Sequence, residues 1–158
     1  MSKSKGVHIF DRFVWVWDNS HDVVVARMVE EALATGEVDP SVVESWRVCA
    51  SIPDLAFRYP EDGGPDPTAL LGLIDGARDA IIRHGNMTAE YLATWSVLEA
   101  ERVSGGFLRS DILRVEALLD VVDGFDHLVN RTFPHDPPGS TWFLGAPTGR
   151  QQIPKRPS

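Results

Sequence analysis

A long amphipathic stretch in the second half of this 158-residue chain constrains the fold more than any other feature. Between Phe107 and Val129, apolar side chains recur at steps of three and four residues, as on the buried face of a helix: Leu108, Ile112, Val115, Leu119, Val122, Phe125 and Val129. Asp126 interrupts this face with a carboxylate. We therefore predict a helix over residues 107–131, packed against other helices, one of which supplies a partner for Asp126.

Three shorter helices are predicted from apolar spacing together with signals at their ends. Asp39–Pro40 and Asp66–Pro67 each combine an N-cap carboxylate with proline at the first helical position, so we predict helices over 40–51 and 67–84. Thr88 predicts a further start, of a helix that continues as far as a pair of glycines near residue 105.

The stretch from Val7 to Leu33 admits two structures. Five apolar residues alternate as in a strand: Val7, Ile9, Phe13, Trp15 and Trp17. Four are spaced as in a helix: Phe10, Phe13, Val14 and Trp17. Because the helical phase continues without a shift to Leu33, we favour helix throughout, with Ser20 as the N-cap of a second helix if the first one breaks.

These elements predict an all-α fold, a compact orthogonal or bundle-like domain of five or six helices over residues 7–133. Residues 1–6 are expected to form a disordered basic arm. Residues 134–158, rich in proline and glycine, are expected to be irregular, with TWFLG packed on the helices or on another subunit. The alternative is an α+β fold in which Val7–Trp17, together with Trp142–Leu144, forms a small sheet beside the helices.

The net charge and the cysteine content of the sequence limit which binding partners and which cellular compartment we expect. The formal charge is −8, and residues 7–149 carry 10 basic and 23 acidic side chains, a net charge of −13. A body of this charge repels phosphate, so we expect neither nucleic acid nor a membrane as partner. With one cysteine, Cys49, and neither an export signal nor an apolar window of membrane length, we expect a cytoplasmic protein.

The motifs of several common chemistries are absent from the sequence. It contains no phosphate-binding loop, no GxGxxG, no HExxH, no paired CxxC and no GxSxG, and we expect no cofactor. Asp120, Asp123 and His127 share one ridge of the last predicted helix, with His135 and Asp136 in the loop that follows. Such spacing is common on acidic helices, so we expect no metal there.

Four ionisable residues interrupt apolar faces of the predicted helices: His21, His84, Arg102 and Asp126. Each has a structural explanation: Arg102 can extend its guanidinium to solvent, and His84 can cap carbonyls at a helix end. In the functional interpretation they line a cleft. His21, oriented by Asp18, and Asp126 then act as base and acid of a cofactor-free elimination, addition or isomerisation. Arg102 would bind a small anionic substrate.

The partner of Asp126 is not obvious from the sequence. Arg102 lies on the neighbouring predicted helix, but about 20 residues of helix, roughly 30 Å, separate the two along the last helix. We therefore prefer His21, Arg27 or Tyr91, which lies at the far end of the neighbouring helix, as the residue that meets Asp126.

Five tryptophans in a chain of this size suggest an interface. On a helix Trp15 and Trp17 would be 200° apart, so at least one of them is expected at a binding surface. We thus expect a binding or accessory protein, an immunity-type or regulatory partner, that acts through protein–protein contacts or forms a homo-oligomer. The alternative is a small tailoring or lyase-like enzyme that uses the acid–base residues above.

Overall fold

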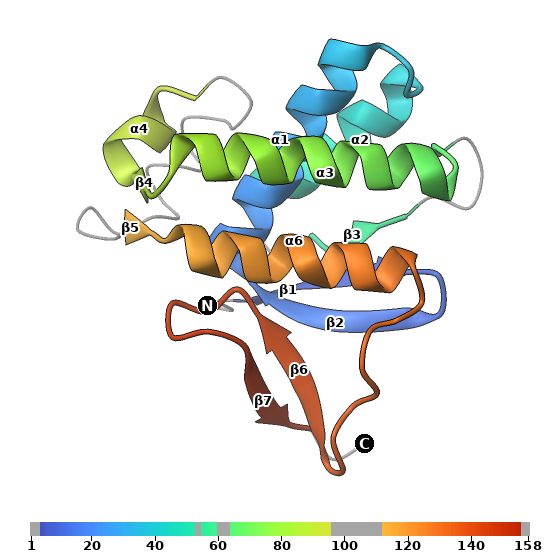
Figure 1. Ribbon diagram of the computed structural model, residues 1–158, viewed down its shortest axis with the longest axis vertical. Helices are drawn as coiled ribbons and strands as arrows, with labels where there is room; N and C mark the ends of the chain where they lie inside the picture. The colour runs from blue at the N-terminus through green and yellow to red at the C-terminus, as the bar shows by residue number, and fades with distance from the viewer. Residues whose placement is uncertain (1–3, 53–54, 60–63, 96–111, 156–158) are drawn as a thin grey trace.

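The computed structural model describes residues 4–52, 55–59, 64–95 and 112–155, and it combines helices with a five-stranded mixed sheet (Figure 1). The helices are α1 (Asp18–Thr35), α2 (Pro40–Ser51), α3 (Pro67–His84), α4 (Ala89–Ala93) and α6 (Val115–Val129). The strands are β1 (Ser4–Ile9), β2 (Arg12–Trp17), β3 (Phe57–Arg58), β4 (Met87–Thr88), β5 (Ile112–Leu113), β6 (Ser140–Leu144) and β7 (Gln151–Pro154). The predicted all-α fold is therefore wrong, and the α+β alternative is correct.

The sheet has the strand order β3-β1-β2-β6-β7. β1 and β2 form an antiparallel hairpin, and β6 lies parallel to β2, with Phe143 opposite Trp15. Helix was the wrong choice for residues 7–17 because the strand alternation decides burial here: Val14 and Val16 are fully buried, whereas Phe13 is exposed. Much of the pairing is local, because β1 and β2 form a hairpin with Ile9 opposite Arg12, and the distant strands β3 and β6 complete the sheet on either side.

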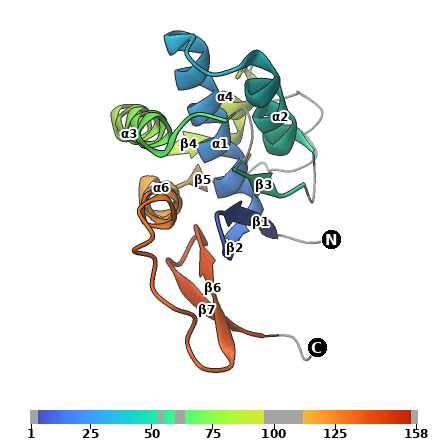
Figure 2. The same ribbon diagram turned by 90° about the vertical axis from the view of Figure 1, so that its right-hand side faces the viewer.

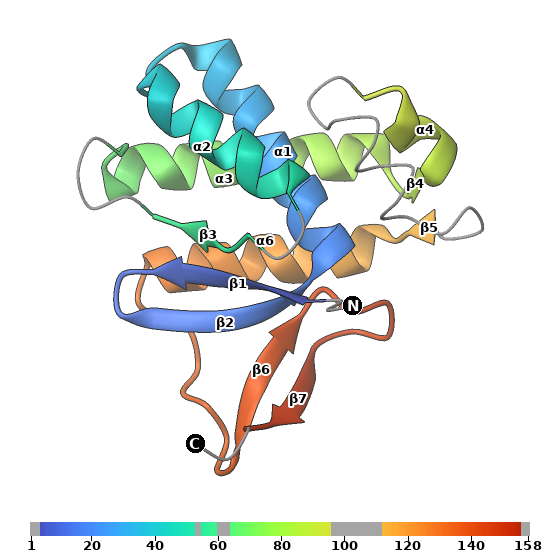
Figure 3. The ribbon, with the colours of Figure 1, turned by 180° about the vertical axis from the view of Figure 1, so that it is seen from behind.

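The described helices all lie on one side of the five-stranded sheet (Figure 2). Viewed from behind, no described helix crosses in front of β2, β6 or β7 (Figure 3). α1 packs on β1 and β2, and α6 packs on β6, so the second face of the sheet is open within the described part of the chain. None of the helices described is long and apolar enough to cross a membrane.

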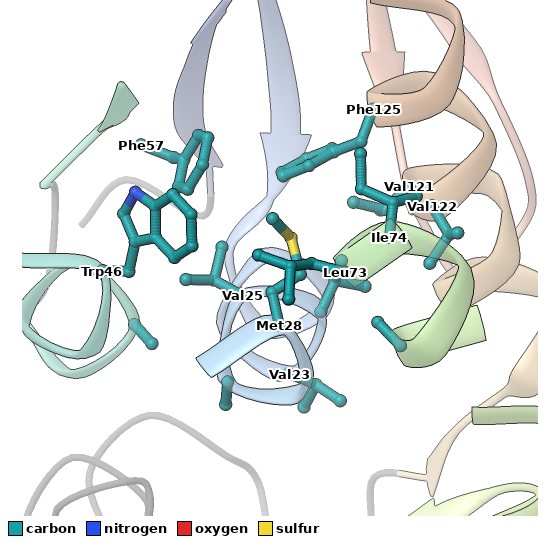
Figure 4. Packing of buried hydrophobic residues seen from close by; sticks show 14 of the residues in the cluster. Val23, Val25, Met28, Trp46, Phe57, Leu73, Ile74, Val121, Val122 and Phe125 are labelled. Carbon is teal, nitrogen blue, oxygen red and sulfur yellow. The ribbon is translucent and has the colours of Figure 1, made fainter. Parts of the chain in front are cut away.

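Helix α1 is the centre of the core and is buried on almost every side from Asn19 to Val29. Its side chains Val25 and Met28 lie among residues of the surrounding elements (Figure 4). The Phe57 ring lies 5.6 Å from the Trp46 ring of α2 and 5.3 Å from the Phe125 ring of α6, centroid to centroid. One apolar core therefore joins the helices to the sheet.

The helix starts predicted at Asp39, Asp66 and Thr88 are confirmed, whereas Ser20 is not an N-cap, because α1 begins at Asp18 and the Ser20 hydroxyl donates to the Gly145 carbonyl. The side chains of Asp39, Asp66 and Thr88 each accept a hydrogen bond from a backbone N–H in the first turn of the following helix. Gly36, in the left-handed conformation, follows α1. The helix after Thr88 is shorter than predicted, because α4 ends at Ala93; residues 96–111 lie outside the described chain.

The long helix begins later than predicted, at Val115, because Ile112–Leu113 forms β5 and pairs with Met87–Thr88. Residues 107–111 lie outside the described chain. The buried face is also shifted: it contains Ala117, Leu118, Val121, Val122, Gly124, Phe125, Leu128 and Val129. Asp126 therefore lies at the border of the buried face and not within it.

The two chain ends differ from the predictions for 1–6 and 134–158. Within the predicted basic arm, Ser4, Lys5 and Gly6 belong to β1, and Lys5 is buried. Within the predicted irregular segment, β6 and β7 form an antiparallel hairpin that extends the sheet. The apolar stretch of β6 is too short for its periodicity to indicate a strand. Pairing with β2 stabilises β6 instead.

Gly145 joins three elements at the end of β6. Its carbonyl accepts a hydrogen bond of 2.7 Å from the Ser20 hydroxyl of α1, and its N–H donates to the Asp120 carboxylate of α6 at 2.9 Å. Its φ is +76°, and a Cβ placed there would lie 2.5 Å from Cγ2 of Val121. Only glycine fits both the backbone conformation and the space.

We predict that Gly145→Ala lowers the free energy of unfolding by about 3 kcal/mol, the sum of left-handed strain and overpacking. Gly139→Ala is the matched control, because Gly139 also has a positive φ, +71°, but a Cβ added to it would meet no described atom within 4 Å. Urea unfolding should show a loss of about 1 kcal/mol for the control. Equal losses for the two variants would contradict the close approach at Gly145.

Candidate functional site

Four aromatic side chains gather on the open side of the sheet: Phe13, Trp15, Trp17 and Phe143, here called the aromatic face. Phe13, Trp15 and Trp17 share this side because they alternate along β2, and Phe143 joins them because it pairs with Trp15. Phe13 is 41% exposed and both tryptophans are half-buried. The binding role predicted for Trp15 and Trp17 remains a prediction, but as strand residues both of them point to one surface.

The rings of the aromatic face contact one another edge to face. Phe13 and Trp15 have centroids 4.9 Å apart at 88°, and Trp17 and Phe143 have centroids 6.1 Å apart at 77°. The Phe13 ring also covers Gly6 of β1, where a Cβ would lie 2.3 Å from Cε2 of the ring. Edge-to-face pairs are favourable, so these side chains are held in place before any partner binds.

Charge is distributed unequally around the molecule. Exposed carboxylates lie mostly on the helices or at their ends: Glu37, Asp39, Glu44, Asp66, Asp75, Asp79, Glu90 and Glu116. Beside Phe13 on the open side lie His8 and Arg58, with Nδ1 of His8 3.5 Å from Nη1 of Arg58. Among the described residues the exceptions are Asp11, in the β1–β2 turn, and Asp136, before β6, so most of the acidic surface lies away from the aromatic face.

A second cluster, here called the polar core cluster, consists of Lys5, His21 and Asp22. The Lys5 ammonium donates to Oδ1 of Asp22 at 2.7 Å and to the carbonyl of Cys49 at 2.8 Å. Nδ1 of His21 lies 3.0 Å from the same Asp22 oxygen. All three side chains are inaccessible to solvent, so this cluster ties β1 to α1 and α2 from inside the core.

Burial lowers the pKa of His21 despite the opposing hydrogen bond and charge of Asp22. A neutral imidazole must donate its Nδ1 proton to the carboxylate, because Asp22 can only accept. Nε2 then carries a lone pair, and it has no hydrogen-bond partner among the described residues. Burial likewise raises the pKa of the Cys49 thiol, which donates to the carbonyl of Ala56 at 3.3 Å and is poorly suited to act as a nucleophile.

The predicted acid–base residues lie in different environments. His21 contacts Asp22 and not the predicted Asp18, whose carboxylate accepts the Asn19 N–H at 2.7 Å. Asp126 lies near the surface of α6, whereas His21 lies inside the core. The cleft predicted to hold both residues is not formed by these two side chains.

The residue that meets Asp126 is Arg78 of α3, with Nη2 of Arg78 3.5 Å from Oδ2 of Asp126. Arg78 also pairs with Asp123, and Asn130 donates to Asp126 at 2.6 Å. The predicted partners His21, Arg27 and Tyr91 are therefore wrong. No signal in the sequence indicates that α3 packs against α6, so the sequence does not identify Arg78 as the partner of Asp126.

The other predicted binding residues lie apart from the sheet. His84 and Tyr91 contact each other near α4, with ring centroids 4.1 Å apart, and Tyr91 lies 6.4 Å from the Trp95 ring. Arg102 falls outside the described chain. The guanidinium of Arg27 covers the Trp95 ring at 4.5 Å, so these aromatics stabilise the packing of α4 on α1.

The acidic ridge on α6 is divided among several partners. Asp120 binds Arg150 at 2.9 Å, Asp123 binds Arg78, and the His127 ring lies 2.9 Å from the Thr132 hydroxyl. Among the described residues, no group of three or more His, Cys, Asp or Glu side chains could hold a metal ion.

A cavity of about 410 Å³ lies between the C-terminal end of α1 and the start of α3. Its charged lining consists of carboxylates from Glu31, Glu37 and Asp66, and Val38 and Leu73 supply apolar surface. No lysine or arginine of the described chain lines it, so this cavity is a poor match for the anionic ligand predicted from Arg102.

No protein-family model, no curated protein and no solved structure matches the chain. The class is therefore defined by the fold and the site alone: an α+β domain with helices on one side of a mixed sheet and an aromatic face on the other.

We predict that Asp22→Asn lowers the free energy of unfolding by about 3 to 5 kcal/mol, because it leaves the Lys5 ammonium buried without a countercharge. Asp123→Asn is the matched control: its partner Arg78 is part-exposed, so the loss should be about 1 kcal/mol or less. The double variant Lys5→Met/Asp22→Leu should recover part of the loss, since it removes the unpaired charge but leaves the buried Nδ1–H of His21 without its acceptor. Chemical denaturation measures all three, and equal losses for the two single variants would contradict a buried ion pair.

Proposed function

We propose that the chain is a binding protein that recognises a partner protein through the aromatic face. The observation that supports this most is the exposure of Phe13 beside two half-buried tryptophans on a sheet face that no described helix covers. Isolated apolar residues are common on protein surfaces, but contiguous aromatic side chains are enriched in binding hot spots. The immunity-type or regulatory role expected from the sequence is one form of this function.

The arrangement of the rings supports binding by apolar contact rather than by charge. The edge-to-face pairs Phe13–Trp15 and Trp17–Phe143 hold the side chains in fixed positions, so little conformational entropy is lost on association. Most of the exposed carboxylates lie on the helices or at their ends, where they favour solubility. A partner would therefore present an apolar patch to β2, where Phe13 is the exposed ring, while the buried Phe143 of β6 supports Trp17 from the side.

The alternative function, a small cofactor-free enzyme, has less support. Its strongest feature is the imidazole of His21, oriented by Asp22 and with a lone pair on Nε2 that no described residue engages. A general base must reach its substrate, however, and this ring is fully buried. As part of the proposal we place the protein in the cytoplasm, where the single buried thiol of Cys49 would remain reduced.

We predict that Phe13→Ser weakens the binding of the partner about thirtyfold, a typical loss of about 2 kcal/mol for one hot-spot side chain. Leu33→Ser is the matched control, because Leu33 is 65% exposed but lies near the end of α1, on the helical side. Wild-type, Phe13→Ser and Leu33→Ser proteins serve as baits in the same cell extract. A protein retained by the wild type and the control but lost by Phe13→Ser is then purified and titrated by calorimetry.

Sedimentation over a concentration series identifies the case in which the partner is a second copy of the chain. Self-association that Phe13→Ser abolishes and Leu33→Ser preserves would assign the aromatic face to a homo-oligomer. The proposal fails if all three proteins, shown to be folded by circular dichroism, retain the same partners and the same oligomeric state.

A further inference from the structure

His21 is held in a position where a second positive charge cannot be accommodated. Its ring is fully buried, and Nδ1 shares one oxygen of Asp22 with the Lys5 ammonium, at 3.0 Å and 2.7 Å. While the imidazole is neutral, Lys5 and Asp22 balance each other. A proton on Nε2 would add a cation beside Lys5 and a buried N–H donor for which the described residues provide no acceptor.

The charged groups that act on His21 come from two elements. Asp22 and Asp18 of α1 favour the protonated ring, whereas Lys5 of β1 and the loss of water around the ring oppose it. The third element of the cluster, α2, contributes the Cys49 carbonyl and a thiol that stays protonated at neutral pH. Desolvation is the largest of these effects, and the folded protein therefore holds the neutral ring.

We propose that the polar core cluster is an acid-sensitive lock: a proton taken up by His21 releases β1 and the start of α1 from α2. Lys5 is the link in this mechanism, because it joins the Asp22 carboxylate of α1 to the Cys49 carbonyl of α2. Protonated His21 places a second cation on the carboxylate oxygen that already receives the Lys5 ammonium, so one negative charge then faces two positive ones. Once the segment opens, water reaches the ring and solvates the new charge.

The direction of the pH effect follows from proton binding. The pKa of His21 is lowered in the folded state from its ordinary value of 6.5, so the open state binds a proton that the closed state rejects. The closed state is therefore favoured above about pH 6.5, and this stability is lost as the pH falls below that value. Between about pH 7.5 and pH 5.5, protonation of the open-state imidazole raises the equilibrium constant for opening by up to about tenfold, or about 1.4 kcal/mol.

Cys49 is a built-in probe of opening, because its thiol is buried next to the Lys5 contact and the chain has no second cysteine. The measurement is the rate of labelling by 4,4′-dithiodipyridine, divided at each pH by the rate in urea-unfolded protein. We expect this ratio to rise about tenfold from about pH 7.5 to pH 5.5 in the wild type, with helical circular dichroism unchanged. A rise that occurs only together with loss of helix would overturn the local lock.

His21→Asn separates the proton from other effects of acid, since its amide occupies the position of Nδ1 and does not titrate. Its labelling ratio should change less than about twofold over the same pH range, because the variant has no imidazole at position 21 to bind the proton. His135→Asn is the matched control: it removes an exposed histidine outside the cluster and should leave the tenfold rise intact. Equal slopes in the wild type and His21→Asn would overturn the proposal.

A measurement on the wild type keeps the proposal testable if His21→Asn does not fold. The chain has five histidines, and an NMR titration follows each imidazole. The ring of His21 should take up its proton in the folded protein at a lower pH than the ordinary imidazole pKa of 6.5. Titration of all five rings near their ordinary pKa would overturn the proposal.

Discussion

The position of β1 in this protein depends on the ion pair between Lys5 and Asp22. A lysine at an inward strand position is costly to bury, and it remains there only because a carboxylate and a carbonyl receive its ammonium. β1 pairs with both β2 and β3, so the contact that holds β1 against α1 and α2 also sets the position of its neighbours. Such a pair adds little net stability, but it disfavours packing arrangements that would leave either charge unpaired.

The helix ends were predictable because their signals are local. Asp39, Asp66 and Thr88 act on N–H groups two or three residues away, and the sequence contains both participants. The sheet was not predictable in the same way. Residues 7–17 satisfied both periodicities, and the turn at Phe10–Asp11 that lets them pair with each other as β1 and β2 carries no glycine or proline signal. The strand that extends this hairpin, β6, follows more than 100 residues later in a segment with the composition of a loop.

The same difference between local and distant information applies to the candidate sites. Trp15 and Trp17 were identified from composition, Phe13 joins them through the alternation along β2, and Phe143 joins them only through strand pairing. His21 was correctly placed on a helix, yet its partner is the adjacent Asp22, which a helical wheel puts 100° away from it. Lys5 would have been found under the strand interpretation, since it continues the inward series of Val7 and Ile9.

The insertion of β6 beside β2 has a consequence for how the chain is made. Ser20 and Gly145 bond across 125 positions, so α1 leaves the ribosome long before the strand that completes the sheet. During that interval β2 is an edge strand, with unpaired backbone groups beside a row of aromatic side chains. Edges of this kind pair readily with other chains. Nascent protein is therefore exposed to aggregation through the whole time between the synthesis of β2 and that of β6.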